Sequence, residues 1–538
     1  MKRLVKDLSF FVKRYSFMVP LLLAAALAFG FQLTNFTYGV DAVARNEYLF
    51  EGRSIAQGRL ILPLLAPLLN LSELFPFADE FLGLLALLSA TILFCVVLKR
   101  ASFDKFNKHF YTAFACLFIT YPIITEYWVY TMMGWNIGLG YVLVAFSLLQ
   151  MLSFFEDKKI WHIILAALML AVAVSIYEAL LPVYVLCVFI VLLVRGLFGE
   201  DEHKRFKTFC INGLLMAIPL VAGLALELVT TEIVISSTPS LPPSLGAANT
   251  IFYKKLGLIG GLEKAFLGIY QDYIVSALWY MPLTILWCAV FVFIAFSIVI
   301  AVRRKAYALL VLSGGSLFSL ILLTLIQGSV SPYRCCLVFS FFTAFTFAIV
   351  LHFALSMPKK LNILRYAASV ALIVFCFIQG VETNNWFCLN HQRYEAEMKV
   401  VDQIGYDLSV HYNLRKPVVF VGQKLLYNER LTDHIYLDRE TQIKYLGESA
   451  YMRKIAQTSV TSMLSWSITA FSQPCTELYK IFEYAGYDLE PCTREMYNEA
   501  RELCKSMPIY PKEGYIQDVG SYIIVRLDAY ASNPVPES

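Results

Sequence analysis

Five ionisable residues lie where long apolar runs of the sequence meet short polar connections, and their types define the chemistry open to them. They are Asp41, Arg59, Glu126, Glu178 and Arg334. A carboxylate can act as a general base that takes a proton from a hydroxyl group. A guanidinium group can bind a phosphate through two aligned N–H donors. The set therefore predicts a site that combines proton abstraction with the binding of an anion.

The apolar runs that must position these residues are long enough to cross a membrane. Hydrophobic residues make up 58% of the 538 residues and charged residues only 16%, which is typical of integral membrane proteins. A helix of about 20 residues crosses a hydrocarbon core of about 30 Å. The predicted spans are Phe17–Leu33, Phe81–Leu98, Phe110–Ile124, Ile137–Phe154, Trp161–Ile176, Pro182–Val194, Phe209–Leu228, Ile274–Val302, Tyr307–Ile326, Cys336–Leu355 and Tyr366–Gln379. We therefore predict a polytopic α-helical bundle of about eleven membrane helices.

Basic residues predict the orientation of these spans. Lys and Arg gather before the first span and after every second one, for example at Lys2, Lys99 and Arg303. Since cytoplasmic loops are rich in such residues, the N-terminus is expected in the cytoplasm and the five ionisable residues at the outer face. The first span is not followed by a small-x-small cleavage site, so it is expected to remain as an uncleaved helix. The net charge of +4 comes largely from cytoplasmic loops, so no nucleic-acid partner is expected.

The first outer loop carries Asp41 together with three arginines. Arg45, Arg53 and Arg59 run against the tendency of arginine to stay on the cytoplasmic side. An anionic partner such as the phosphate of a lipid carrier would account for them. Contact with lipid headgroups and a local Asp–Arg pair would account for them equally well. Within the same loop, the segment Leu60–Leu74 is apolar enough to lie in the membrane interface.

Two acids and one arginine lie at other outer helix ends. Glu126 belongs to the aromatic connection TEYWVYTMMGWN, whose Tyr and Trp residues fit either an interfacial belt or the stacking of sugar rings. Tyr177 and Glu178 lie in SIYEALLP, a connection so short that both are expected close to membrane depth. The alternative for Glu178 is a structural hydrogen bond to a neighbouring helix. Arg334 opens an apolar span and could either close a charged cluster with these acids or bind a phosphate.

The end of the chain differs in composition from the rest. Residues 1–380 form the predicted transmembrane domain, and residues 381–538 form a predicted small extracytoplasmic α/β domain. The runs PVVFVG and SYIIVRL are strand-like, and helical patterns occur around Tyr451–Ser465 and Thr493–Lys505. In the loop Thr230–Asp272, a stretch rich in Pro, Ser and Gly predicts irregular structure.

Four cysteines belong to the predicted outer domain. Cys388, Cys475, Cys492 and Cys504 could form one or two disulfides in an oxidising compartment. No pair has CxxC spacing, so no zinc site is predicted. The chain also contains no GxSxG, HExxH, GxGxxG or P-loop pattern, which argues against a reaction driven by a nucleotide on the inner side.

Three short motifs and the start of the tail resemble a known family. The motifs are Gly58-Arg59-Leu60-Ile61-Leu62-Pro63 after an acid in the first outer loop, SIYE at Ser175–Glu178, and Arg334. The tail opens with NNWFCLNHQRYEAEMKVVDQI. Together they resemble the bacterial Gtr-type glucosyltransferases that modify O-antigen, over most of the chain. The chain departs from that family in having Val40-Asp41 where two adjacent acids are expected, and Glu178 where Gln is expected.

The resemblance implies a GT-C-like bundle with its active site at the outer face of the bacterial cytoplasmic membrane. The donor would be a polyprenyl-phosphate sugar, usually glucose on undecaprenyl phosphate, and the acceptor a cell-envelope glycan. Carried over by position, Asp41 would be the general base, and Arg59 and Arg334 would hold the donor phosphate. Tyr177 and Glu178 would help to shape the sugar pocket. A divalent metal could replace or assist the arginines, but no metal or cofactor is predicted.

These residue types suit an inverting transfer. A carboxylate deprotonates the acceptor hydroxyl as the anomeric carbon is attacked, and positive charge stabilises the phosphate that leaves. Glu126 enters the site only through its predicted position. Two alternatives remain open: a transporter or flippase for a lipid-linked sugar, with ionisable residues near the bilayer midplane, and a polysaccharide polymerase or ligase, with a large outer loop between late spans. The clustering of ionisable residues at helix ends favours the enzyme.

Overall fold

The computed structural model describes residues 2–39, 42, 45, 49, 53–69, 71, 76–130, 134–199, 206–238, 252–278, 280–358, 362–422, 424, 462–466 and 474–528. The chain divides into two compact units. The helical unit consists of Met1–Thr34, Asn46–Trp128 and Met132–Phe387. The C-terminal unit consists of Asn35–Arg45, Val129–Thr131 and Cys388–Ser538.

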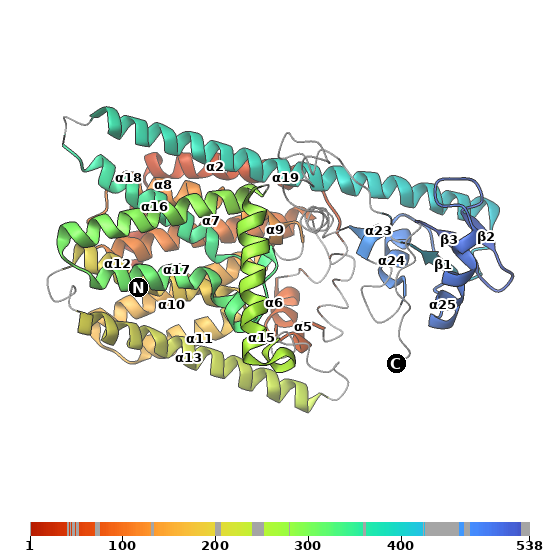
Figure 1. Cartoon of the computed structure of the whole chain (residues 1–538), viewed down its shortest axis with the longest axis horizontal. Helices are drawn as coiled ribbons and strands as arrows, with labels where there is room; N and C mark the ends of the chain where they lie inside the picture. Colours follow the sequence, from red (N-terminus) through yellow and green to blue (C-terminus); the bar gives the residue numbers. More distant parts are fainter. Residues whose placement is uncertain are drawn as a thin grey trace. The chain divides into compact units, whose positions relative to one another are not determined.

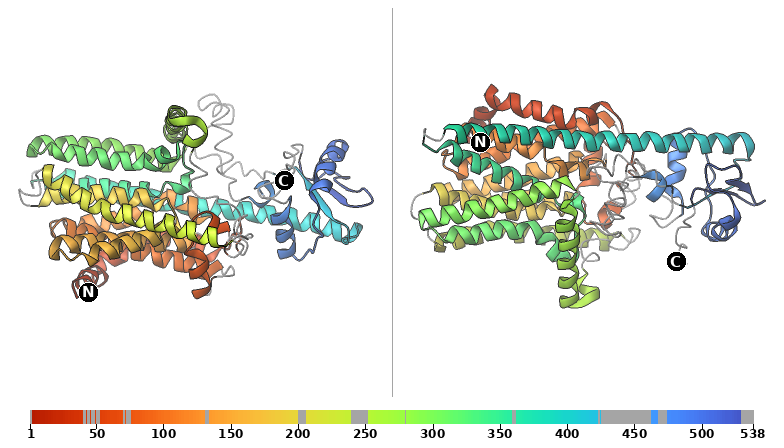
Figure 2. Two further views of the ribbon diagram at one scale, coloured as in Figure 1. Left: turned by 90° about the horizontal axis from the view of Figure 1, so that it is seen from below. Right: turned by 45° about the horizontal axis from the view of Figure 1, so that its top comes forward.

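Within the described residues, nine helices are long and apolar enough to cross a membrane. They are α2 (Tyr15–Thr34), α7 (Pro76–Ala101), α10 (Gly134–Asp157), α12 (Leu180–Phe198), α13 (Phe206–Ser237), α16 (Met281–Arg304), α17 (Ala308–Gln327), α18 (Val338–Leu355) and α19 (Asn362–His411). Each overlaps one predicted span, although α19 extends far beyond the predicted Tyr366–Gln379 and α16 begins later than the predicted Ile274. Figures 1 and 2 show the long helices of the helical unit running side by side. The protein is therefore a polytopic helical membrane protein.

The two remaining predicted spans are shorter helices. They are α8 (Lys108–Ile119) and α11 (Trp161–Ile176). The apolar run of α8 continues past Ile119 into the short turn η1 (Pro122–Ile124) and helix α9 (Thr125–Trp128) instead of extending as one helix. Pro122 explains the break, because proline disfavours a helical conformation in the residue before it. Eleven crossings therefore stay a prediction.

Glycines allow two of the long helices to approach closely. A Cβ atom at Gly83 of α7 would lie 2.9 Å from the carbonyl carbon of Gly134, the first residue of α10. A Cβ at Gly138 would lie 2.8 Å from the Cβ of Ala86. Such contacts leave no room for a side chain, so the glycines bring the two backbones together, as small residues do between membrane helices.

Short elements connect the long helices at the end of the helical unit where the predicted site residues lie. They are α5 (Arg53–Ala56), α6 (Leu62–Leu68), η1, α9, α15 (Tyr253–Gly268), η3 (Ile269–Ile274), η4 (Val275–Leu278) and η5 (Tyr333–Cys335). Helix α6 falls within the apolar segment predicted for the membrane interface. At the opposite end, α1 (Lys2–Val12) precedes α2 and packs against α7.

Helix α15 is not predicted by the sequence pattern. It lies in the segment Thr230–Asp272, described above only as a loop, and it crosses the direction of the long helices (Figures 1 and 2). Its sequence contains four glycines, and because glycine is a poor helix former, the sequence gives little indication of a helix here. Gly257 adopts φ +70°, which bends the helix. The predicted irregular stretch rich in Pro, Ser and Gly lies mostly outside the described residues.

The C-terminal unit is built on a small mixed sheet. Its strands are β1 (Val418–Val421), β2 (Ile516–Asp518) and β3 (Ile523–Arg526), in the order β1-β3-β2. Strand β3 pairs in parallel with β1, with Val418 opposite Ile523, and antiparallel with β2. The strand-like runs PVVFVG and SYIIVRL supply β1 and β3.

Helices cover this sheet. They are α23 (Met463–Trp466), α24 (Thr476–Tyr484), α25 (Arg494–Leu503), the turn η7 (Cys504–Ser506) and the last half of α19. Val401, Ile404 and Leu408 of α19 are fully buried in the core, at the spacing of one helix face. Thr493 caps α25 by accepting a hydrogen bond from the backbone N–H of Met496. Most of the predicted helix around Tyr451–Ser465 lies outside the described residues.

Candidate functional site

The centre of the candidate site is η5, the tight turn between α17 and α18. Gly328 ends α17 in the left-handed conformation, with φ +68°. The backbone N–H of Cys335 then donates to the carbonyl oxygen of Pro332 at 2.8 Å, and the N–H of Cys336 donates to that of Tyr333 at 2.9 Å. Because the turn is so tight, the consecutive side chains of Tyr333, Arg334 and Cys335 project in different directions.

On one side of η5, Arg59 meets the connection between α11 and α12. The guanidinium carbon of Arg59 lies 4.7 Å from the centre of the Tyr177 ring. Its Nε lies 3.8 Å from a carboxylate oxygen of Glu178. The Arg59 side chain is 15% exposed and that of Glu178 38% exposed. A cation–π contact and an ion pair therefore hold this guanidinium group at the surface of the bundle.

Tyr177 links this group to η5. Helix α11 ends at Ile176, and Tyr177 follows in an extended conformation before α12 begins. Its hydroxyl group lies 3.1 Å from the sulfur of Cys335. Burial raises the pKa of the Tyr177 phenol, and the nearby charges of Arg59 and Arg334 act in the opposite direction. The predicted residues Arg59, Tyr177, Glu178 and Arg334 thus form one group around Tyr177.

A second carboxylate, Glu227 of α13, adjoins the same group. It is buried and accepts a hydrogen bond from the hydroxyl of Thr231 at 3.0 Å. Gly58, the residue before Arg59, has φ +81°, and a Cβ added there would lie 3.1 Å from a carboxylate oxygen of Glu227. Glu178 is close enough for its charge to act on Glu227. The only signal for Glu227 in the sequence is an acid inside an apolar run, which marks a candidate functional residue.

On the other side of η5, Glu126 lies among aromatic residues. The Tyr280 hydroxyl donates a hydrogen bond to the Glu126 carboxylate, and both side chains are buried. The Tyr280 ring stacks on that of Tyr333, with centroids 4.7 Å apart and an angle of 13° between the planes. The Tyr333 hydroxyl donates to the backbone carbonyl of Asp272 at 2.6 Å. Glu126 therefore contacts the turn through an aromatic layer.

The surroundings of Tyr280 favour its neutral phenol over the phenolate. Burial raises the pKa of its phenol, and the charge of Glu126 raises it further. The phenol therefore remains a proton donor to the carboxylate. The ring of Trp386 meets the Tyr280 ring edge-on, with centroids 5.9 Å apart, and restricts its position.

The structure thus brings five of the six predicted site residues to the surroundings of η5. Arg59, Arg334, Tyr177 and Glu178 form one group, and Glu126 lies across the turn. Asp41, the predicted general base, lies outside the described residues, as does its neighbour Val40. Within the part of the chain that the structure describes, no group of three or more His, Cys, Asp or Glu residues is arranged to hold a metal ion.

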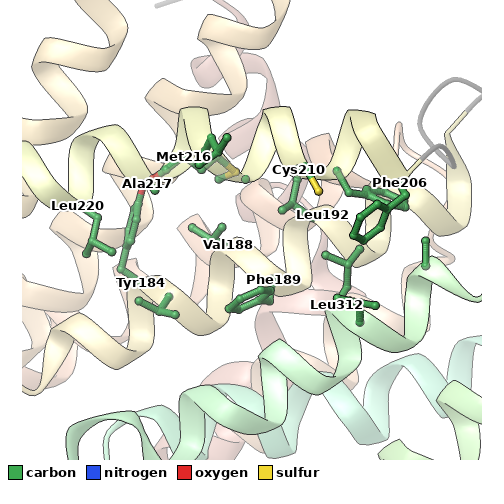
Figure 3. Close-up of a pocket in the computed structure, with 16 residues that line it drawn as sticks. Tyr184, Val188, Phe189, Leu192, Phe206, Cys210, Met216, Ala217, Leu220 and Leu312 are labelled. Atoms are coloured by element: carbon green, nitrogen blue, oxygen red, sulfur yellow. The ribbon is translucent and has the colours of Figure 1, made fainter. Parts of the chain in front are cut away.

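An apolar groove of about 560 Å³ runs along α12 between α13 and α17 (Figure 3). Tyr184, Val188, Phe189 and Leu192 of α12 form its floor, and Leu220, Ala217 and Phe206 lie on α13. Both α12 and α13 lead toward the group around Arg59. Glu178 and Ala179 directly precede α12, and Glu227 lies on the same face of α13 as Leu220, two helical turns further on.

The fold and the site define a membrane-embedded protein with arginine and carboxylate side chains gathered at one end of a helical bundle. Residues 30–353 match the family described as Glucosyl transferase GtrII, and the chain belongs to this family. The expectation of a Gtr-type glucosyltransferase is confirmed, and the protein is a membrane glycosyltransferase. The matched region contains all six predicted site residues and ends within α18. No curated protein and no solved structure matches the chain.

Proposed function

We propose that the protein transfers glucose from a polyprenyl-phosphate donor, with undecaprenyl phosphate as the carrier, to a hydroxyl group of a cell-envelope glycan. The reaction would take place at the outer face of the bacterial cytoplasmic membrane. The grouping of Arg59 and Arg334 around Tyr177 is the observation that carries this proposal, because two guanidinium groups near one tyrosine suit a sugar phosphate.

The proposed chemistry is a single inverting displacement. The acceptor hydroxyl oxygen attacks the anomeric carbon, and the bond from that carbon to the phosphate oxygen breaks. The hydroxyl proton passes to Asp41, and the lipid phosphate leaves with one more negative charge. Arg59 and Arg334 stabilise that charge as it develops, which is where fixed positive groups lower a barrier most.

Glu178 has a second role in this proposal. Its carboxylate lies 3.8 Å from Nε of Arg59, longer than a direct hydrogen bond. The contact therefore helps to hold the guanidinium near Tyr177. In this proposal the donor phosphate binds beside the Arg59 guanidinium, and Tyr177 helps to shape the pocket for the sugar.

The apolar groove supports a lipid-linked donor. A polyprenyl chain is a long hydrocarbon, and the groove offers apolar walls between Tyr184 and Leu192 of α12. With the phosphate at Arg59, the chain would follow α12 and α13 into the membrane. A soluble nucleotide-sugar donor would make no use of such a surface.

The test is sugar transfer by the purified full-length protein in proteoliposomes. Radiolabelled undecaprenyl-phosphate glucose serves as donor and crude host polysaccharide as acceptor. We expect transfer by the wild type, its loss in Asp41→Asn, and its retention in the matched control Arg303→Gln, whose side chain is exposed at the other end of α16. Movement of the lipid-linked sugar between leaflets, with no transfer from any polyprenyl-phosphate hexose, would instead identify a transporter.

A further inference from the structure

Two cysteines of the C-terminal unit lie next to each other in its core. Cys475 directly precedes α24, and Cys492 precedes Thr493, the N-cap of α25. Cys475 is fully buried and Cys492 is 8% exposed. The pair therefore joins the starts of the two helices that cover the sheet.

Tyr479 fixes the backbone of both cysteines. Its own N–H donates to the carbonyl oxygen of Cys475 at 3.1 Å, and its hydroxyl oxygen accepts from the N–H of Cys492 at 3.0 Å. The same hydroxyl donates to the carbonyl of Val418 in β1 at 2.7 Å. The Cys475 thiol lies 3.5 Å from the carbonyl oxygen of Phe420, two residues along the same strand. Both cysteines are thereby held against β1.

The two thiols are close enough for each to shift the pKa of the other. Burial and the proximity of Cys492 raise the pKa of Cys475, whereas the proximity of Cys475 lowers the pKa of Cys492. Cys492 is thus the thiol that more easily forms a thiolate, the reactive form in disulfide exchange.

The other two cysteines of the C-terminal unit have different neighbours. Cys388 lies 3.7 Å from the side-chain nitrogen of Gln392 on α19. The Cys504 thiol lies 3.4 Å from the carbonyl oxygen of Arg501. Neither of these contacts involves another cysteine, whereas Cys475 and Cys492 both contact Tyr479.

We propose that Cys475 and Cys492 are joined by a disulfide in the protein as it acts in the cell. In the proposed step, the Cys492 thiolate attacks the disulfide of an extracytoplasmic thiol–disulfide oxidant, and Cys475 then displaces the oxidant from the mixed disulfide. Two thiols of this chain lose two protons and two electrons, and the oxidant is reduced to a dithiol. The proposal rests on the predicted outer position of the C-terminal unit and is independent of the sugar that is transferred.

The disulfide would brace a polar pocket. A cavity of about 440 Å³ lies between α24, with Thr476 and Lys480, and the segment Asp488–Cys492. The proposed bond ties the beginning of α24 to the end of that segment. Its expected effect is to hold the two walls of the pocket together and to raise the thermal stability of the C-terminal unit.

Mass spectrometry of the full-length wild-type protein provides the direct test. Free thiols are blocked with N-ethylmaleimide during lysis, and the protein is digested without reduction. We expect a peptide that links Cys475 to Cys492 and that disappears after reduction. Blocked, unlinked Cys475 and Cys492 in the wild-type protein would overturn the proposal without any need for a variant.

Two variants test the specificity of the pair. In Cys475→Ser, Cys492 is expected to become reactive toward the maleimide after denaturation, whereas Cys388→Ser leaves the linked peptide unchanged. A reductant should lower the unfolding temperature of the wild type and of Cys388→Ser but not that of the double variant Cys475→Ser/Cys492→Ser. An equal effect of the reductant on the double variant would contradict the predicted stabilisation by this bond.

Discussion

The guanidinium group of Arg59 lies over the ring of Tyr177 at 4.7 Å, although the two residues are 118 positions apart in the sequence. The Tyr177 hydroxyl in turn lies 3.1 Å from Cys335 of η5. Three connections that are far apart in the sequence therefore meet at one tyrosine. Substitutions at this meeting point should affect sugar transfer more than folding.

Replacing Arg59 should separate the effect of its charge from that of its shape. Arg59→Lys keeps the charge but loses the planar set of N–H donors, and Arg59→Gln loses both. We expect transfer to fall in both variants, by roughly 100- to 1,000-fold in Arg59→Gln, the range seen when a transition-state donor is removed. The measurement is the initial rate of transfer in proteoliposomes. Full activity in Arg59→Gln would remove Arg59 from the proposed site.

Gly58→Ala should disturb the turn that carries Arg59. An alanine there must adopt φ +81° and place its Cβ 3.1 Å from the Glu227 carboxylate. The left-handed conformation alone costs about 1–2 kcal/mol for such a residue, so roughly a tenfold loss of transfer is expected. The control is Gly30→Ala in α2, where an added Cβ has no neighbour within 4 Å. Equal activities of the two variants would contradict this prediction.

Tyr280→Phe removes the phenol that donates to Glu126. The loss of a buried hydrogen bond to a charged group should destabilise the protein by about 1–3 kcal/mol. Thermal unfolding in detergent, followed by intrinsic fluorescence, measures this. The control is Tyr270→Phe, because the Tyr270 side chain is exposed. An unchanged unfolding temperature in Tyr280→Phe would show that Glu126 does not depend on this contact.

Filling the apolar groove should impair long donors selectively. Ala217 lies on the wall formed by α13, and Ala217→Phe would occupy part of the groove (Figure 3). We expect a higher KM for an undecaprenyl donor and little change for a donor with a short prenyl chain. Val221→Phe, at an exposed position of the same helix outside the groove, is the matched control. The same change in KM for both donors would rule out the groove as the site of the hydrocarbon chain.

Glu397 should be essential for the stability of the C-terminal unit. It forms a buried ion pair with Arg393 and accepts hydrogen bonds from the Ser462 hydroxyl and the backbone N–H of Met463. Removing one partner of such a pair leaves the other charge buried without compensation, which lowers the free energy of unfolding by about 3–5 kcal/mol. Glu397→Ala should therefore expose the unit to limited proteolysis, whereas Glu395→Ala, two positions away and exposed, should not. Equal protease resistance would refute this role.

The sequence predicts the membrane helices well because each helix corresponds to one continuous apolar run. Apolar runs of sufficient length identify α7, α12 and α18 without knowledge of their neighbours. Helix α15 is not predicted because it lacks such a local signal. Its glycines give no helical signal, and its position across the bundle depends on contacts with other segments, such as the Tyr253 hydroxyl that donates to the carbonyl of Leu325.

The sequence predicts most residues of the candidate site, but it predicts less well which of them lie next to each other. For Arg334 the sequence leaves open a charged cluster with acids or the binding of a phosphate, and the structure brings Glu178 and Glu126 near its turn. The approach of Glu227 to Gly58 could not be predicted, because it depends on how α13 packs beside α5. A single sequence contains no record of such a contact between distant segments.

The groove along α12 has a consequence for kinetics. It is bounded by α13 and α17 and remains partly open between them, so a lipid-linked donor could enter by diffusing sideways within the bilayer. The concentration that governs saturation would then be the donor's mole fraction among the surrounding lipids, not its amount per volume of buffer. If inert phospholipid is added while the total amount of donor stays constant, the donor's mole fraction in the membrane falls. The rate of sugar transfer should then decrease.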